Sequence, residues 1–190
     1  MKKTKKQFSI LIILLLSINS LFSQNKTENE NIVMWSSAQK LTLDDFGIKK
    51  ESTDQMLSFA QFSIDYSVNG FSFLAKNFNK KVRNYMIKSA SWINPNKNVS
   101  TSLLYQQTIF DIAEIYTRQF RKALKKNKKK AISGTRFVEE LNQKSMAEFT
   151  NRRIEYDEAT DYARDTQKQN EWELQILKEL EELKEYAYDK

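Results

Sequence analysis

The stretch that decides the fold is AQFSIDYSV, residues 60–68. Apolar residues stand at every second position with polar residues between them, and this period of two is typical of a half-buried β-strand. Asn69-Gly70 follows, a dipeptide that favours a type I′ hairpin turn because both central residues of that turn take positive φ. We therefore predict a return strand at 71–76 and a further strand at 91–93, which together form a small antiparallel sheet.

The C-terminal half of the sequence has the spacing of helices. Apolar residues recur three and four positions apart, which predicts a helix over 102–126 with candidate N-caps at Ser100 and Thr101. Residues 135–188 contain neither glycine nor proline, so two or more helices are expected there. The last helix, over 172–186, is amphipathic and is expected to pack on its own domain.

Composition favours a single domain of the α+β class. A chain of 190 residues with 40% hydrophobic content suits one core. Three glycines and one proline are few for an all-β protein with many tight turns. We predict one α+β domain over residues 32–190, with a small antiparallel sheet and several long helices.

The N-terminus has the pattern of a signal peptide. Lysines within residues 2–6 precede a nearly uncharged apolar run at 8–22. The run is roughly 15 residues long, shorter than the roughly 20 that a helix needs to span a bilayer. We predict a signal peptide over 1–23, a flexible mature N-terminus over 24–31, and an exported protein of the periplasm, the cell surface or the medium.

The charge gives little support for nucleic-acid binding. The formal net charge is +7, but the four lysines of residues 1–23 leave only +3 on the remainder. A basic run persists at Lys125, Lys126, Lys128, Lys129 and Lys130. Its simplest interpretation is a solvated helix end and loop, because cations suit the negative end of a helix dipole. Contact with an anionic membrane or an acidic partner is the alternative interpretation.

The sequence contains no histidine and no cysteine. This excludes an ordinary zinc site with His or Cys ligands, and it also excludes a disulfide. A serine nucleophile would lack a histidine base. We therefore expect no metal, no cofactor and no enzymatic activity.

The segment LLYQQTIFDIAEIY, residues 103–116, resembles the active helix of a secreted bacterial family of unknown function. That family is predicted to consist of zincin-type metalloproteases with a pattern like L-L-x-H-E-Q-x-H-F-D-I-A-E. In such enzymes two histidines on one helix face bind zinc, and the glutamate is the general base. The alignment puts Tyr105 and Ile109 at the histidine positions and Gln106 at the glutamate position.

A second segment, YDEATDYA at 156–163, is similar to the family pattern Y-D-x-x-T-x-H-G. Here Tyr162 stands at the position of the third zinc ligand and Ala163 at the glycine. The family pattern continues with a Gln and a Trp, which match Gln169 and Trp172. Two further segments resemble family landmarks in the same order: Trp35-Ser36 with residues 41–46, and residues 89–92.

The resemblance implies a zincin-like fold that has lost its catalytic groups. Tyr105, Gln106, Ile109 and Tyr162 are then degenerate site positions, and the two tyrosines and the isoleucine are expected to converge beside one groove. Such a protein is expected to be an inactive homologue that binds a peptide, an envelope component or a partner protein. The alternatives are an assembly protein without protease ancestry that uses the helix over 172–186, and a peripheral membrane protein that uses the basic run.

Carboxylates near the matched segments are expected to be solvated or ion-paired. They are Asp111, Glu114, Asp157 and Asp161. Arg118 and Arg121 follow closely in the sequence and are the expected partners.

Overall fold

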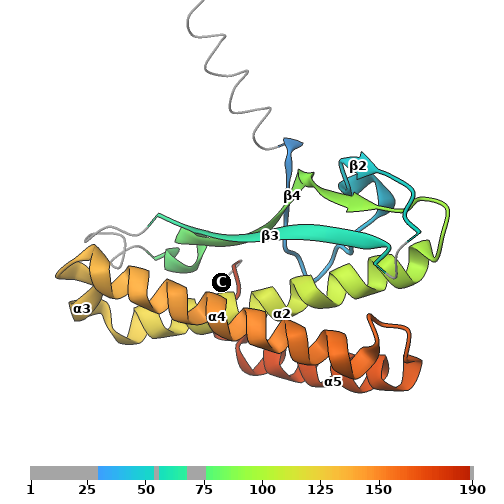
Figure 1. The fold of residues 1–190 in the computed structure, drawn as a ribbon. Helices are drawn as coiled ribbons and strands as arrows, with labels where there is room; N and C mark the ends of the chain where they lie inside the picture. Colours follow the sequence, from blue (N-terminus) through green and yellow to red (C-terminus); the bar gives the residue numbers. More distant parts are fainter. Residues whose placement is uncertain (1–29, 54–55, 68–75, 189–190) are drawn as a thin grey trace, which may run out of the picture. The chain divides into compact units, whose positions relative to one another are not determined.

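The computed structural model describes residues 30–53, 56–67 and 76–188 (Figure 1). Residues 1–23, predicted to be a signal peptide, lie outside the described part of the chain, as does almost all of the predicted N-terminal segment 24–31. The expected Asn69-Gly70 turn and most of the return strand at 71–76 also lie outside it.

Two long strands form the main part of the sheet. β3 (Ser58–Tyr66) runs antiparallel to β4 (Val82–Ile93), in a register that extends from Ser58 opposite Ile93 to Tyr66 opposite Val82. The predicted strand is confirmed, and Ala60 and Phe62 of its apolar face are buried. β4 includes the predicted strand at 91–93 but begins much earlier, at Val82.

The sheet is mixed, so the prediction of a purely antiparallel sheet is wrong. β4 also pairs with two short strands, β1 (Ile32–Met34) and β2 (Ile48–Lys49), and β2 runs parallel to it. Gly47 permits this approach: its N–H donates a 2.9 Å hydrogen bond to Lys88 O, and a Cβ at Gly47 would lie 2.7 Å from that oxygen. Any residue with a side chain would force the chain away from β4.

Helices make up the rest of the fold, and the α+β class is confirmed. They are α2 (Val99–Lys126), α3 (Lys128–Ile132), α4 (Thr135–Thr160) and α5 (Thr166–Glu182). Single 3-10 turns lie at η1 (Leu43–Asp45), η3 (Phe78–Lys81) and η4 (Lys184–Tyr186). None of the helices in the described part of the chain is both long and apolar enough to cross a membrane.

The helix boundaries differ from the prediction at several points. α2 begins at Val99 with Asn98 as its N-cap, so the predicted caps Ser100 and Thr101 are wrong and lie within the first turn. The lysines after Asn127 belong to the short helix α3 instead of a loop. α5 begins at Thr166, one to two turns before the predicted start, where Asp165 caps it by accepting a hydrogen bond from the Lys168 N–H.

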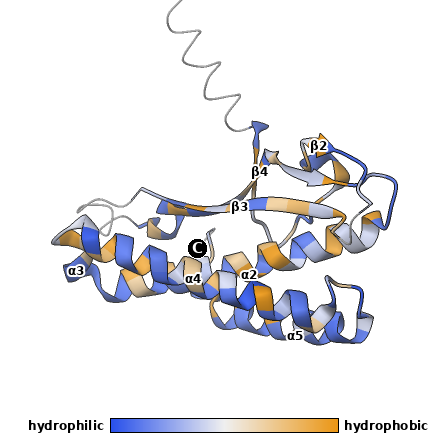
Figure 2. Cartoon of the chain, in the orientation of Figure 1, coloured by the Kyte–Doolittle hydropathy of each residue, from blue (hydrophilic) through white to orange (hydrophobic). Residues whose placement is uncertain are grey.

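α2 is the central element of the compact unit formed by residues 33–190. Strands β3 and β4 cover one side of α2, and helices α4 and α5 also pack against it (Figure 1). Figure 2 shows that hydrophilic residues prevail along α4 and α5. The apolar residues of α5 that face inward, Ile176 and Leu180, are buried, so the predicted packing of this helix on its own domain is confirmed.

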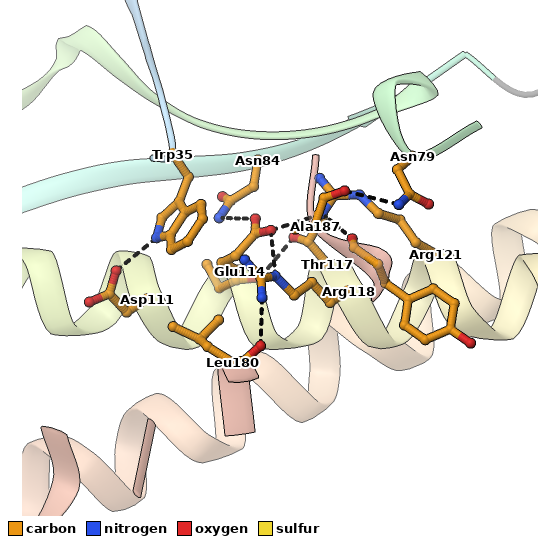
Figure 3. A network of polar contacts seen from close by, with 12 residues as sticks. Trp35, Asn79, Asn84, Asp111, Glu114, Thr117, Arg118, Arg121, Leu180 and Ala187 are labelled. Carbon is orange, nitrogen blue, oxygen red and sulfur yellow. Dashed lines mark hydrogen bonds and ion pairs between the residues drawn. The ribbon is translucent and has the colours of Figure 1, made fainter. Parts of the chain in front are cut away.

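A layer of buried charge on α2 separates two apolar clusters. One cluster includes Ile109 and Ile115, and the other includes Phe120 and Leu124. Glu114, Arg118 and Arg121 are almost completely buried. Figure 3 shows the polar contacts that they make. Buried charges are tolerated when they are paired and hydrogen-bonded.

Arg121 joins three parts of the chain. Its guanidinium donates hydrogen bonds to Glu114 Oε1 (2.8 Å), to Val82 O at the start of β4 (2.7 Å) and to Tyr186 O after α5 (2.9 Å). Burial lowers the pKa of Arg121, and the Glu114 carboxylate opposes this effect. The Arg121 guanidinium therefore links the sheet, α2 and the C-terminal segment through hydrogen bonds.

Arg118 and two asparagines extend the network. Arg118 donates to Glu114 Oε1 (3.0 Å) and to Leu180 O of α5 (2.6 Å), while Asn84 of β4 donates to Glu114 Oε2 (3.3 Å). Asn79 donates a further 2.9 Å hydrogen bond to Ala187 O. The expected pairing of Glu114 with both arginines is confirmed.

Replacing Arg121 by Met is expected to lower the free energy of unfolding by about 3–5 kcal/mol. The change removes the guanidinium that donates hydrogen bonds to Val82 O and Tyr186 O. It leaves Arg118 as the one described ion-pair partner of Glu114. Urea unfolding followed by circular dichroism measures the loss.

Arg136→Met is the matched control for this experiment. Arg136 pairs with Glu140, but their side chains are 91% and 61% exposed, and surface pairs contribute roughly 0–1 kcal/mol. Equal losses in the two variants would contradict a central role for Arg121.

Candidate functional site

Three tyrosines from separate elements meet beside the N-terminal half of α2. The Tyr105 ring lies 5.8 Å from the Tyr156 ring of α4 in a stacked arrangement and 5.8 Å from the Tyr162 ring in an edge arrangement. The Tyr105 hydroxyl donates a 2.8 Å hydrogen bond to Asp157 Oδ1. Two of the three positions that the resemblance aligns with zinc ligands, Tyr105 and Tyr162, are thus in ring contact.

The chemistry of Tyr105 is that of a neutral phenol. Burial raises the pKa of Tyr105, and the charge of Asp157 raises it further. Burial also raises the pKa of Asp157, against the hydrogen bond from Tyr105 and the charge of Arg153. A phenol that keeps its proton is a hydrogen-bond donor and an aromatic surface, and it is a poor metal ligand.

Gln106 and Ile109 lie behind the tyrosines in the core. Both are fully buried, and Ile109 belongs to the apolar cluster against which Tyr162 packs. Gln106 Nε2 donates a 3.0 Å hydrogen bond to Ser58 Oγ, whereas Gln106 Oε1 has no partner among the described residues. An amide in this position cannot accept a proton as a general base does.

The carboxylates singled out in the sequence all have protein partners. Asp157 accepts a hydrogen bond from the Tyr105 hydroxyl, and Asp161 forms an ion pair with Arg164. Glu114 forms the ion pairs described above. Asp111 Oδ1 accepts hydrogen bonds from Trp35 Nε1 (2.7 Å) and Gln107 Nε2 (2.8 Å). Burial raises the pKa of Asp111, although Lys40, Trp35 and Gln107 each lower it.

The loop that carries Tyr162 has an unusual backbone. Asp161, Tyr162 and Ala163 have φ values of 48°, 57° and 64°, in the left-handed region that L-residues other than Asn and Asp seldom adopt. Tyr162 and Ala163 each cost on the order of 1–2 kcal/mol in this conformation, and strained residues concentrate at functional sites. The strained loop therefore marks Tyr162 independently of its aromatic contacts.

A cleft of about 230 Å³ opens beside Tyr105 and Tyr162. The start of β3, the start of α2 and the strained loop supply its walls. Its other lining residues are Thr53, Met56, Leu57, Ser58, Lys97, Asn98, Thr101, Ser102 and Arg164. Ile109, the third position expected at the groove, is not among the described lining residues.

Sequence reasoning missed several residues of this cleft. Ser58 and Ser102 are buried polar residues, and their positions before the expected strand and at the expected helix start gave no signal of burial. Lys97 and Arg164 stand outside the matched segments. The left-handed backbone at Asp161–Ala163 could have been suspected only from the glycine that the family pattern places at Ala163.

Residues identified as family landmarks meet in a buried cluster below the cleft. The Tyr156 hydroxyl donates a 2.8 Å hydrogen bond to Gln169 Oε1, and Gln169 Nε2 donates to Thr108 Oγ1 at 2.9 Å. The Trp172 ring lies 5.4 Å from the Tyr156 ring, edge to face. These contacts hold α4 and α5 against α2.

Comparison of the chain with protein-family models, with curated proteins and with solved structures finds no match in any of the three. The resemblance to zincin-type proteases therefore stays a prediction from the motifs.

Ala163→Gly is expected to leave the free energy of unfolding unchanged or to raise it by up to ~1 kcal/mol. Relief of the left-handed conformation, about 1–2 kcal/mol, outweighs the loss of one buried methyl group, about 0.8 kcal/mol. Ala147→Gly, at an exposed position in the middle of α4, is the control and is expected to lose about 1 kcal/mol. Equal losses in urea unfolding would contradict strain at Ala163.

Asp111→Asn is expected to gain stability over the wild type as the pH rises. The folded-state pKa of Asp111 is raised, so its contribution to stability is present below the pKa of the unfolded chain and is lost as the pH rises through the folded pKa. Asn keeps the oxygen that accepts from Trp35 and Gln107 and has no charge to bury.

Melting temperatures measured from about pH 3 to about pH 7 test this expectation. The difference between Asp111→Asn and the wild type should be smallest at the acid end and positive at the neutral end. Glu182→Gln, an exposed change on α5, controls for the loss of one negative charge. A difference that shrinks toward neutral pH would contradict the sign.

Proposed function

We propose that this chain is an exported, catalytically inactive homologue of zincin-type proteases, and that it binds an extended peptide or partner segment in the cleft beside Tyr105 and Tyr162. The observation that carries the proposal is the ring contact between these two residues, 5.8 Å between centroids, at the mouth of a cleft. A zinc site assembled from the aligned positions would bring the same two elements together.

The distribution of matches and mismatches supports this ancestry. Landmarks that agree with the family pattern have structural roles: Asp111 holds Trp35, and Tyr156 holds Gln169. Among the positions that depart from the pattern, Tyr105 and Tyr162 line the cleft and Gln106 donates to Ser58, which also lines it. Ile109 is buried in the apolar core. Loss of catalysis with retention of a scaffold produces this division.

Local chemistry favours binding over reaction. The cleft has an aromatic wall and hydroxyl donors, and Gln106 behind it cannot exchange a proton. β4 is the single described pairing partner of β3, so the other edge of β3 offers backbone groups to an extended segment. Leu57, just before β3, and Ser58, its first residue, line the cleft, so a segment bound there can continue along this edge.

Two other functions stay as predictions and would use different surfaces. Helix-mediated assembly would use the outer side of α5, where Leu174 and Leu177 are 70% and 59% exposed. Membrane contact would use the exposed lysines Lys128, Lys129 and Lys130 of α3. The peptide-binding proposal has the more specific support, because strain, burial and aromatic contacts coincide at one cleft.

The test combines zinc uptake, cleavage and binding on the purified chain. After equilibration with zinc and dialysis, metal content is measured by mass spectrometry, and we expect less than one zinc per chain. A pool of random-sequence hexapeptides with free termini is then added with and without chelator. We expect the peptides to stay intact and to slow hydrogen exchange at the start of β3.

Tyr162→Ala is expected to weaken the binding of this pool roughly three- to tenfold, because one aromatic contact surface is lost. Tyr188→Ala, which removes a tyrosine that does not line the cleft, is the control. Stoichiometric zinc, cleavage that chelator abolishes, or equal affinity of the wild type and Tyr162→Ala would overturn the proposal.

A further inference from the structure

The start of α2 forms one wall of the cleft and is open to a ligand. Asn98, its N-cap, has a φ of 47° and makes no side-chain cap, and no described side chain accepts a hydrogen bond from the first turn. Lys97, Asn98 and Thr101 all line the cleft. The first-turn N–H groups of a helix carry partial positive charge and suit an anion.

Ser102 supplies the second observation. Its residue is 6% exposed, it lines the cleft, and its hydroxyl has no hydrogen-bond partner among the described residues. The Ser102 oxygen is not one of the fully buried atoms without a partner, so it can be reached from the cleft and is available to a ligand or an ordered water. Ser58, which also lines the cleft, accepts a hydrogen bond from the Gln106 amide through its hydroxyl oxygen, and its own hydroxyl proton can be donated to a ligand.

The charges of the described lining residues favour a negative ligand. Each lining residue that the structure describes is neutral or basic. Arg164 is already paired with Asp161, whereas Lys97 has no ion-pair partner in the described part of the chain. One uncommitted cation, hydroxyl donors and an uncapped helix start together match a single carboxylate.

The size and the apolar walls limit what is attached to that carboxylate. The cleft, about 230 Å³, is smaller than the roughly 300–1,000 Å³ of pockets that enclose drug-sized ligands. Met56, Leu57, Tyr105 and Tyr162 supply apolar and aromatic surface next to the donors. These dimensions fit the last residue of a chain, with an apolar side chain.

We propose that the cleft captures the free C-terminal carboxylate of a peptide whose last side chain is apolar or aromatic. The first turn of α2, Ser102 and Lys97 bind the carboxylate, and the two cleft tyrosines contact the side chain. This proposal rests on the proposed function and names its ligand class. The preceding residues of the peptide would run along the free edge of β3.

The experiment compares two forms of one peptide pool on the full chain. N-acetylated hexapeptides, random at five positions and ending in Phe, are prepared as free acids and as C-terminal amides. Binding is measured by fluorescence polarisation with a labelled N-terminus. We expect the acids to bind at least tenfold more tightly than the amides, because a charge-assisted hydrogen bond contributes about that factor.

Ser102→Ala isolates the carboxylate contact. The Ser102 hydroxyl has no described partner in the protein, so its removal should leave unfolding unchanged while it weakens binding of the acid pool about tenfold. Ser100→Ala, in the same turn but exposed and outside the cleft lining, should bind normally. Lys97→Gln, at an exposed position, should weaken the acids several-fold and reduce the salt dependence of their binding.

The outcomes separate this inference from the proposed function. Equal binding of acids and amides, with loss of both in Tyr162→Ala, would overturn carboxylate capture and leave peptide binding in place. Binding of neither pool would overturn both. Normal affinity of the acids for Ser102→Ala and Lys97→Gln would also overturn the assignment of the carboxylate to this end of α2.

Discussion

The buried Glu114 carboxylate is the group on which the rest of the structure depends. Two guanidinium groups from its own helix neutralise it, and each guanidinium also binds a carbonyl oxygen from another element. Removing charge from water is expensive, so the arrangement is stable only while every partner is in place. The cost of burying one carboxylate thus fixes the positions of β4 and α5 relative to α2.

The cleft depends on this arrangement but is built differently. Around Glu114 almost every polar atom has a partner, although Asn84 Oδ1 is an exception. At the cleft, an uncapped helix start, an unpartnered Ser102 and three left-handed residues lie together. Well-satisfied networks hold a fold, whereas unsatisfied groups and strain concentrate where a protein meets a ligand. The contrast separates the structural part of α2 from the end for which we propose a binding role.

Sequence patterns predicted those elements in which a single periodicity dominates. The alternation in β3 and the helical spacing up to Lys126 are of this kind. The first part of β4 was missed because Asn84 occupies a buried position and breaks the apolar alternation. The start of α2 was misplaced because Asn98 begins the helix in a left-handed conformation without the side-chain cap that sequence rules look for. The parallel pairing of β2 rests on Gly47, whose close contact with Lys88 has no local signal.

The candidate site was only partly predictable for a related reason. The resemblance selected Tyr105 and Tyr162, and their rings do meet. It could not select Ser102 or Lys97, because an open helix start is recognised from the absence of contacts in three dimensions. Nor could composition distinguish Asp111 and Glu114, which are buried and hydrogen-bonded, from ordinary surface carboxylates.

The path of the chain through the buried network also determines when the protein can fold during synthesis. Arg118 and Arg121 find acceptors at Leu180 and Tyr186, which a ribosome adds more than fifty residues later. Until those residues emerge, Arg118 and Arg121 lack these two acceptors, although Glu114 is already present to pair with both. The buried network is therefore complete only when the segment that follows α5 has been made.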